Sequence, residues 1–498
     1  MAYVPLDDRP VNLDAVRMLA GLAGAQLLTP PPEALGSFTR PGDCDAIVRW
    51  LAALPASVAH LIVSLDMLCH GGLLASRAAP ATGDPEEAGR RAAERLSALE
   101  QLRAARPNLP ISALGVLLRS SISVTSEEQL DDWRRIHAVA TAEDAATATL
   151  GERLAAAGVI REVAGSYLAA RARNLQVHRA AIDLARRGAL DFLLLCQEDA
   201  APHGIHVEEQ ASLTELIDST GMGDRVRIQP GADEGGMLLL ARTLLRRHKF
   251  GLAIQPHFGP GGPEAVLLYE DRSLYESLMA KLSILGGRRG FGTHLLLHVL
   301  EGEPEDLFMV AQEGRAFEGF LGSVSQVKAG WAVADVSFAN GADPGFVARL
   351  LERVSPFDLS AFAGWNTASN TVGCVLAHLA CRELGVQLLP GREFARRHLE
   401  FLVSRFADDY LYQGRVRQRL MNEARQDGHS VFLLDEAARG RMQQRLEEEM
   451  AREFQLFWDE HGRRPLDSGL TLRAARATFS LPWPRLFEVN ARVQVEVA

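Results

Sequence analysis

The fold of this chain is decided by the stretch Asp191-Phe-Leu-Leu-Leu-Cys-Gln-Glu-Asp-Ala-Ala-Pro-His-Gly204. It opens with a short apolar run that has the length of a buried strand. Pro202 and Gly204 then mark the residues after the run as a loop and not a helix. A continuous apolar strand is typical of a parallel sheet, because helices cover both faces of such a sheet. The stretch therefore predicts an α/β protein with charged groups at its strand ends.

The same rhythm of apolar run, polar turn and helical stretch recurs along the first half of the chain. Further apolar runs lie at residues 2–6, 25–28, 60–65, 112–118, 226–229 and 251–255. Stretches with helical periodicity lie between them, at residues 13–24, 86–106, 127–157, 166–187 and 235–248. Strands that alternate with helices form parallel sheets, and a long series of such units fits a (β/α)-barrel. We therefore expect residues 1–258 to form a TIM-barrel-like domain.

A glycine- and proline-rich loop at residues 258–263 ends this series. After it, apolar runs at 265–268, 307–310, 331–338 and 360–363 alternate with helical stretches at 274–285, 292–301, 345–354 and 371–384. These units are enough for a small doubly wound α/β domain, which we predict over residues 264–390. From residue 391 the sequence is charged and helical and closes with β-type residues. This predicts a mainly helical C-terminal region with terminal strands over residues 391–498.

The bulk composition limits the partners of the protein. The 498 residues carry a formal net charge of −10, which argues against nucleic acid and against an anionic membrane surface. Charge begins at Asp7, and no apolar run approaches the ~18 residues of a membrane span. The 5 cysteines are odd in number and form no C-x-x-C pair, which is typical of reduced thiols in a cytosol. We expect a cytoplasmic protein with a small-molecule partner, and the oligomeric state is left open.

Polar residues follow the predicted strands at the point where each strand ends. In parallel α/β folds, ligands bind at the carboxyl ends of the strands, because the loops converge there. In chain order, the candidate residues of the first domain are Asp7, Asp8, Arg9, Asn12, Asp66, Arg77, Arg119, Glu198, Asp199, Asp233 and Glu234. In the second domain, Asn366 and Asn370 stand between a strand and a helix. Their amides suit hydroxyls or an anion, and they equally suit capping of that helix.

Glu198 and Asp199 are the strongest candidates for catalysis. Two adjacent acids in a loop have no capping duty, whereas Asp233 precedes a helical stretch and is equally well explained as its cap. Carboxyl groups held close together shift each other's pKa, so that one donates a proton near neutral pH while the other stays ionised. We predict Asp199 as the proton donor, with Glu198 or Asp66 as the group that orients or charges it. The arginines at neighbouring strand ends would pair with these acids or hold an anionic substituent.

A metal site is the alternative reading of the same strand ends. Three histidines lie close along the chain to two of the acids, and His and Asp side chains together suit zinc or manganese. The set is Asp66, His70, Asp199, His203 and His206.

Other motifs are less specific. His294 and His298 have the i,i+4 spacing of a zinc helix but lack the Glu that a zinc protease uses as base, so we expect a buried helix there. The sequence contains no phosphate-binding G-x-x-x-x-G-K-[ST] loop and no G-x-S-x-G elbow, and we expect no cofactor.

Several motifs together resemble a bacterial family catalogued as domain of unknown function 4127. They are Val4-Pro-Leu-Asp-Asp-Arg-Pro-Val-Asn12, Ser64-Leu-Asp-Met67, Gly71-Gly-Leu-Leu-Ala-Ser-Arg77, Ala200-Ala-Pro202 and Gly364-Trp-Asn-Thr-Ala-Ser-Asn370. In that family, aromatic residues often stand at the positions of His70 and His203, and the first acid of the pair is commonly Asp where this chain has Glu198. The resemblance therefore implies a carboxylate at residue 198 and does not favour the metal.

A looser likeness indicates a function. Glu198-Asp199 looks like the Asp-Asp pair of some retaining β-N-acetylhexosaminidases, in which one acid orients the substrate acetamide and the other serves as acid/base. By this likeness we expect a glycosidase-like hydrolase that acts on a carbohydrate. A metal-dependent hydrolase, or a non-catalytic binder of sugars or sugar phosphates, is the alternative.

Overall fold

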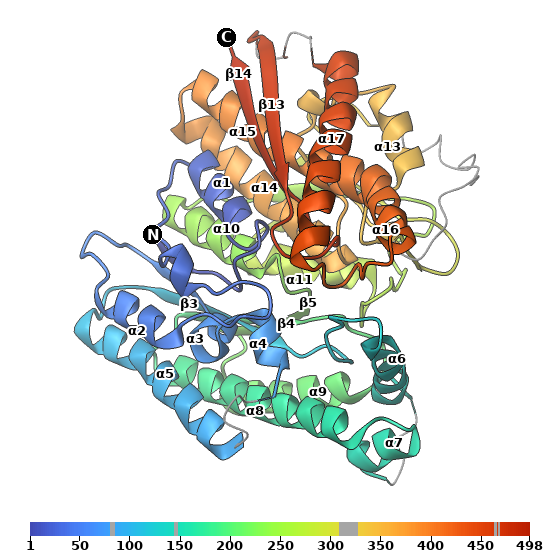
Figure 1. Cartoon of the computed structure of the whole chain (residues 1–498). Helices are drawn as coiled ribbons and strands as arrows, with labels where there is room; N and C mark the ends of the chain where they lie inside the picture. The colour runs from blue at the N-terminus through green and yellow to red at the C-terminus, as the bar shows by residue number, and fades with distance from the viewer. Residues whose placement is uncertain (80–84, 144–147, 308–326, 463–465, 467–468) are drawn as a thin grey trace. The chain divides into compact units, whose positions relative to one another are not determined.

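The computed structural model describes residues 1–79, 85–143, 148–307, 327–462, 466 and 469–498 (Figure 1). The chain divides into two compact units. The first comprises Met1–Leu13 and Gln26–Leu239, and the second comprises Asp14–Ala25 and Leu240–Ala498. Each unit is built on a parallel sheet covered by helices, which confirms the mixed α/β class predicted from the sequence.

The first unit contains a sheet of five parallel strands. They pair in their order along the chain, β1-β2-β3-β4-β5. The strands are β1 (Ala2–Val4), β2 (Leu61–Ser64), β3 (Ile111–Leu117), β4 (Phe192–Gln197) and β5 (Val226–Pro230). Because all five run in the same direction, their carboxyl ends lie along one edge of the sheet.

Helices cover this sheet mainly on one side (Figure 1). They are α2 (Cys44–Ala52), α3 (Leu65–His70), α5 (Pro85–Ala105), α8 (Arg161–Arg186) and α9 (Ile205–Ser219). Shorter elements occupy the connections, namely η1 (Pro32–Ala34), α4 (Leu73–Arg77), α6 (Gln129–Ala140) and α7 (Leu150–Ala156).

Alternate residues of each strand point to opposite faces of the sheet. Ala2 and Val4 join the core under the covering helices. On the other face, α10 (Gly235–His248) begins against the sheet, where a Cβ on Gly236 would lie 2.2 Å from the Tyr3 hydroxyl. Only a glycine allows this close approach of helix and strand.

A closed barrel is not shown by the described residues. The strand order of the first sheet ends at β1 on one side and at β5 on the other, whereas a barrel pairs its last strand with its first. The predicted strand at residues 25–28 contributes one isolated bridge, between Ala2 and Leu28. The apolar run at residues 251–255 lies in a strand of the other sheet. Open sheets and barrels use the same βα units, so the repeating pattern does not distinguish them.

The second unit contains another five-stranded parallel sheet, with the order β12-β10-β8-β6-β7. Its strands are β6 (Ala253–Phe258), β7 (Arg288–Arg289), β8 (Thr293–His298), β10 (Ala332–Asp335) and β12 (Ala361–Ala363). A separate parallel pair is formed by β9 (Glu305–Asp306) and β11 (Phe338–Ala339).

Helices pack on both faces of the second sheet. Helix α14 (Ala368–Leu388) contacts β10 and β12, and it also contacts α11 (Leu274–Ile284) and α1 (Asp14–Leu22). On the opposite face, Leu296, Val333 and Phe362 join a core with Phe346 of α13 (Pro344–Leu351). The doubly wound topology itself is not shown, because only the two-residue β7 lies on the far side of β6.

Three local predictions in this unit have different outcomes. The helix predicted at residues 292–301, with His294 and His298, is wrong, since these residues form β8. The apolar run is too short for its type to be settled by periodicity. The predicted strand at 265–268 is a loop. The strand predicted at 307–310 lies outside the described residues beyond Leu307.

The C-terminal region is mainly helical, as predicted. It contains α15 (Gly391–Arg405), the π-helix η4 (Phe406–Val416), α16 (Arg417–Gln426) and α17 (Glu436–His461), preceded by the short η3 (Pro356–Asp358). An antiparallel pair, β13 (Leu472–Ser480) and β14 (Asn490–Val497), closes the chain. The division into three domains at residues 1–258, 264–390 and 391–498 stays a prediction. Across the described residues, none of the helices combines the length and apolar character of a segment that crosses a membrane.

Candidate functional site

The loop after β1 places one guanidinium between two carboxylates. Arg9 Nε and Nη2 donate to Asp7 Oδ2 over 2.9 and 2.7 Å, and Arg9 Nη1 and Nη2 donate to Asp233 over 3.1 and 2.5 Å. Asn12 Nδ2 donates to the same two carboxylates, each over 2.9 Å. All four side chains are buried. This network joins the loops after β1 and β5, the two ends of the strand order.

Burial controls the protonation of this network. It raises the pKa of Asp233, and the neighbouring Asp7 carboxylate adds to the rise, whereas the Arg9 guanidinium opposes it. Burial also raises the pKa of Tyr3, whose hydroxyl donates to the backbone carbonyl of Asn12 over 2.8 Å. Tyr3 therefore stays neutral and holds the loop of Asn12 against β1.

Two further ion pairs lie at the central strand ends. Arg77, the last residue of α4, pairs with Glu198, and Arg119, after β3, pairs with Asp199. The side chains of Glu198 and Asp199 are 11% and 15% exposed. Asp199 has a φ of +40°, in the left-handed region that non-glycine residues rarely adopt. Such strained residues cluster at functional sites, because the surrounding structure must hold them in place.

Asp66 is a further buried acid of the group. It lies in the first turn of α3, which Ser64 caps at the end of β2, and its Oδ2 accepts the Val116 backbone N–H over 3.0 Å. Burial raises the pKa of Asp66 to about 7, the hydrogen bonds oppose the rise, and the charge of Glu198 adds to it. Asp66 is therefore a carboxyl group that changes protonation near neutral pH.

These residues form one electrostatic cluster at the carboxyl edge of the first sheet. The charge of Glu198 raises the pKa of both Asp66 and Asp233. The pKa of Arg77 depends on the charges of Arg9, Arg119, Glu198 and Asp199. Parallel strands make this convergence possible, since each strand delivers its next loop to the same edge.

The cluster contains polar atoms that have no partner. Asn12 Oδ1, Arg77 Nε and Glu198 Oε2 are buried and make no hydrogen bond within the described part of the chain. A buried polar group without a partner costs about 1–3 kcal/mol. Natural proteins keep such groups where a ligand or ordered water can bond to them.

Two other candidates of the first unit have local roles. Glu234 is buried, and its Oε2 accepts the backbone N–H of Ala232 over 2.9 Å, so it shapes the loop that carries Asp233. Asp8 is half-buried, unlike Asp7 and Arg9 beside it. Substrate binding by Asp8 and Glu234 stays a prediction.

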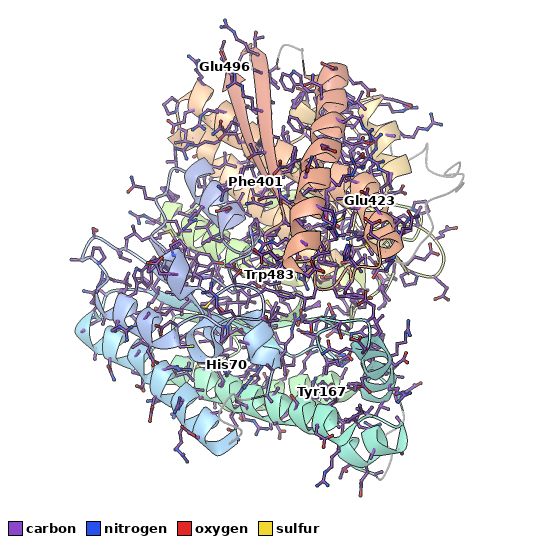
Figure 2. The ribbon with its side chains drawn as sticks, viewed as in Figure 1. His70, Tyr167, Phe401, Glu423, Trp483 and Glu496 are labelled. Atoms are coloured by element: carbon purple, nitrogen blue, oxygen red, sulfur yellow. The ribbon has the colours of Figure 1, made fainter. Side chains whose placement is uncertain are left out.

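The histidines of the alternative metal site are placed differently from one another. His70 ends α3 (Figure 2), and burial lowers its pKa. His203 is exposed, whereas His206 is buried with its Nε2 hydrogen-bonded to the backbone of Ala201. Among the residues that the structure describes, no group of three or more His, Cys, Asp or Glu could hold a metal ion. The arrangement does not favour the metal-dependent reading.

The two asparagines predicted in the second unit lie in a turn and a helix cap. Thr367 is the N-cap of α14, and Asn370 Nδ2 donates to its Oγ1 over 2.9 Å. Asn366 has a φ of +54°, and its carbonyl accepts the Asn340 N–H over 2.7 Å. These contacts explain both residues structurally, and their part in substrate binding stays a prediction.

The second unit contains a buried group of carboxylates and one histidine at its strand ends, which was not predicted as a group from the sequence. Asp343 caps α13 and lies 3.4 Å from His298 Nε2, at the end of β8. Asp335, at the end of β10, accepts the Asp343 N–H over 2.7 Å, and Asp409 of the π-helix accepts the Gly364 N–H over 2.8 Å. Burial raises the pKa of Asp335 to about 6 and that of Asp409 to about 7. These carboxylates hold loops at the strand ends through backbone hydrogen bonds.

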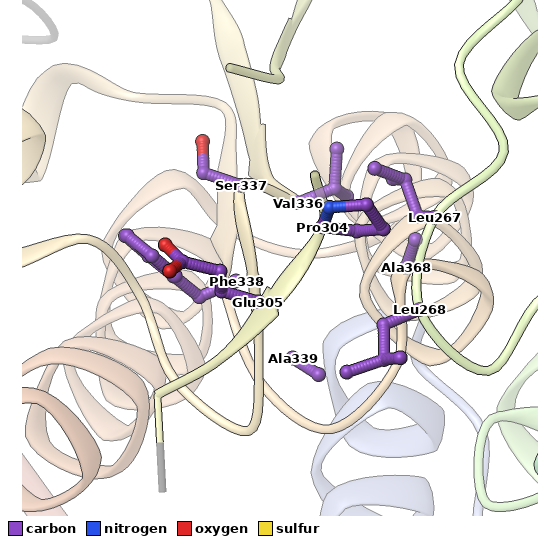
Figure 3. A pocket seen from close by; sticks show the side chains of 9 residues that line it. All are labelled: Leu267, Leu268, Pro304, Glu305, Val336, Ser337, Phe338, Ala339 and Ala368. Atoms are coloured by element: carbon purple, nitrogen blue, oxygen red, sulfur yellow. The ribbon is translucent and has the colours of Figure 1, made fainter. Parts of the chain in front are cut away.

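The second unit also has a small pocket beside the β9–β11 pair (Figure 3). Its lining is mostly apolar and includes Leu267, Leu268 and Phe338, with Glu305 and Ser337 as polar side chains. The pocket has room for about one water molecule. It is too small for a sugar ring.

The fold and the first-unit cluster define a parallel α/β protein with a buried, charged site at the carboxyl ends of its strands. The chain belongs to the family described as protein of unknown function DUF4127, which matches residues 1–492. This confirms the resemblance carried by the sequence motifs. Searches of curated proteins and of solved structures gave no match.

Proposed function

We propose that the first unit is a hydrolase that acts on a carbohydrate at the carboxyl ends of β1–β5. The observation that carries the proposal is the contrast between Asp66 and Glu198. Burial raises the pKa of Asp66 to about 7, whereas Glu198 is held in an ion pair by Arg77. Two carboxyl groups, one able to donate a proton and one ionised, are what acid/base cleavage of a glycosidic bond requires.

The proposal gives each strand-end acid a role. Asp66 supplies a proton to the leaving-group oxygen, and Glu198 acts as the ionised partner that stabilises the positive charge developing on the sugar. Water then adds to the anomeric carbon and returns a proton to Asp66. Asp199, predicted from the sequence as the proton donor, pairs with Arg119. A carboxylate in an ion pair accepts hydrogen bonds, so we assign Asp199 to binding substrate hydroxyls. The hydrogen-bonded network around Arg9 then holds the loops after β1 and β5 in place.

The unpartnered atoms also fit the polar groups of a sugar. Glu198 Oε2 is an acceptor and Arg77 Nε is a donor, and the two side chains are paired with each other. A sugar carries both donors and acceptors, so its polar groups can bond to both atoms.

Turnover of a panel of nitrophenyl glycosides tests the proposal. Asp66→Asn and Glu198→Gln should each lower kcat by about 10²–10⁴-fold, the usual contribution of one acid/base side chain. The matched control is Asp191→Asn. Asp191 pairs with Arg103 and precedes β4, at the amino end of the strands, so this variant should keep its activity. If the native protein cleaves no glycoside, or the control loses as much activity as the two variants, the proposal is wrong. Binding of sugars without turnover would indicate the non-catalytic binder.

A further inference from the structure

We propose that the carbohydrate bound at the strand-end cluster carries a protonated amine, so that the substrate is an amino sugar whose ammonium group bonds to Asn12 and Glu198. This inference rests on the proposed carbohydrate function and specifies its substrate class. It is carried by the placement of two buried, unpartnered acceptor oxygens among carboxylates.

The first of these acceptors is Asn12 Oδ1. Asn12 is fully buried, and its Nδ2 donates to both Asp7 and Asp233, so the side chain points into the cluster. If the Asn12 amide rotated by a half turn, its oxygen would face the two carboxylates in place of its nitrogen. Oδ1 therefore remains the acceptor that needs a donor, and it has no hydrogen bond within the described residues.

The second acceptor is Glu198 Oε2. Its partner oxygen, Oε1, accepts from Arg77, whereas Oε2 is buried and has no hydrogen bond to the described residues. Glu198 also acts electrostatically on Asp233, the residue that Asn12 bonds to. The two acceptors therefore lie in the same group of charges.

The charges of the cluster favour a cation. The arginines at the strand ends are already engaged by carboxylates, since Arg9 bonds to Asp7 and Asp233, and Arg77 and Arg119 each hold one acid. An anionic substituent at the two acceptor oxygens would meet like charge, because Asn12 bonds to Asp7 and Asp233 and Glu198 is itself a carboxylate. Asp66 is a further acid that interacts electrostatically with Glu198. The guanidinium of Arg173, on α8, also interacts electrostatically with Asp66. Both acceptor oxygens thus lie beside or on carboxylates, to which an ammonium group can donate without like-charge repulsion.

An ammonium group also matches the acceptors in number and kind. It carries up to three N–H donors and no acceptor, and hydrogen bonds to charged groups are the stronger ones in proteins. A neutral hydroxyl at the same carbon supplies one donor and no charge. An acetamide supplies one N–H donor, no charge and a bulkier group.

Calorimetric titration with glucosamine, glucose and N-acetylglucosamine tests the inference, because these sugars differ in the group on one carbon. Glucosamine should bind the native protein about tenfold or more tightly than the other two, the worth of one charge-assisted hydrogen bond. Glu198→Gln keeps the shape and removes a charge, and should reduce this preference to about threefold or less. Asn12→Ser is a second variant that should weaken it if Glu198→Gln fails to fold. Asp191→Asn, at the other end of the strands, should leave it unchanged.

The outcomes separate this inference from the proposed function. Equal binding of the three sugars, or a preference for N-acetylglucosamine, overturns the inference, and so does a preference that survives both variants. Cleavage of neutral nitrophenyl glycosides with no amine preference overturns the inference and leaves the hydrolase standing. Amine-selective binding without cleavage of any glycoside supports the inference and rejects the hydrolase.

Discussion

The Arg9→Met substitution removes the guanidinium that lies between Asp7 and Asp233. Arg9 Nη2 donates to both carboxylates, over 2.7 and 2.5 Å, and the side chains of Arg9, Asp7 and Asp233 are only 6%, 7% and 4% exposed. Removing one partner of a buried ion pair costs about 3–5 kcal/mol, because the remaining charge stays buried without compensation. Here two carboxylates are left facing each other, so we expect a loss of stability near the upper end of this range.

Peptide-resolved hydrogen exchange measures this loss in the unit where it occurs. A loss of about 3–5 kcal/mol corresponds to about 10²- to 10⁴-fold faster exchange of the protected amides. We expect it in the peptides of β1 and β3–β5, whereas β13 and β14, in the second unit, serve as an internal reference. Arg103→Met is the matched control. It removes the guanidinium of a pair whose side chains are 19% and 49% exposed, so the acceleration should stay below about tenfold.

The pH dependence gives a second test of the same reasoning. Without Arg9, one of the two facing carboxyl groups takes up a proton, so the folded state binds more protons than the unfolded state. Stability then falls as pH rises, and the gap between Arg9→Met and the native protein should be wider at about pH 8 than at about pH 5. An acceleration under tenfold, or a gap that does not change with pH, would refute the picture of two buried carboxylates held apart by one guanidinium.

Three other changes test separate parts of the structure. Because burial raises the pKa of Asp66 to about 7, the native protein should lose stability as pH rises from about 4 to about 7. Asp66→Asn should make that slope shallower in urea unfolding, and an unchanged slope would contradict the assignment. Asp343→Ala removes the cap of α13, whose carboxylate accepts the N–H groups of Gly345 and Phe346 over 2.8 and 3.1 Å. The free energy of unfolding, measured in urea, should fall by about 0.5–2 kcal/mol. Gly71→Ala places a Cβ 2.7 Å from the Gly42 backbone at a φ of +88°, so its melting temperature should fall further than that of Gly188→Ala, whose Cβ would meet nothing within 4 Å. Equal losses in the two glycine variants would show that the contact does not matter.

The sequence predicts the location of the candidate site better than it predicts the shape of the sheet. Asp7, Arg9, Glu198 and Asp233 could be placed at one edge because parallel strands deliver their loops to the same side. Whether the sheet closes depends on strand tilt and stagger, which apolar runs of a few residues do not encode. The sequence also predicts that arginines pair with the strand-end acids, but it does not say which pairs form. Arg9 engages Asp233 across 224 residues of chain, a partnership that local pattern cannot reveal.

The unpredicted residues of the second unit show the same limit. His298 was assigned to a helix, because an apolar run flanked by histidines has the same composition in a strand and in a helix. Asp409 lies on the π-helix η4, and nothing in its neighbours signals the wider helical turn. Its hydrogen bond to Gly364 exists only once the helix has packed behind β12.

Helix α1 (Asp14–Leu22) belongs to the second unit, although the chain returns to the first unit at Gln26. It packs on α14 and α15 through buried residues such as Leu19 and Leu22. During synthesis on the ribosome, α1 is therefore made long before α14 and α15. Its apolar residues lack these partners while residues 26–239 are synthesised. Domains generally fold as they emerge, but the second unit can be completed only when the residues of α14 and α15 have left the exit tunnel. Cleavage of the chain between Leu239 and Leu240 would accordingly give no self-sufficient C-terminal half, because the fragment would lack its first helix.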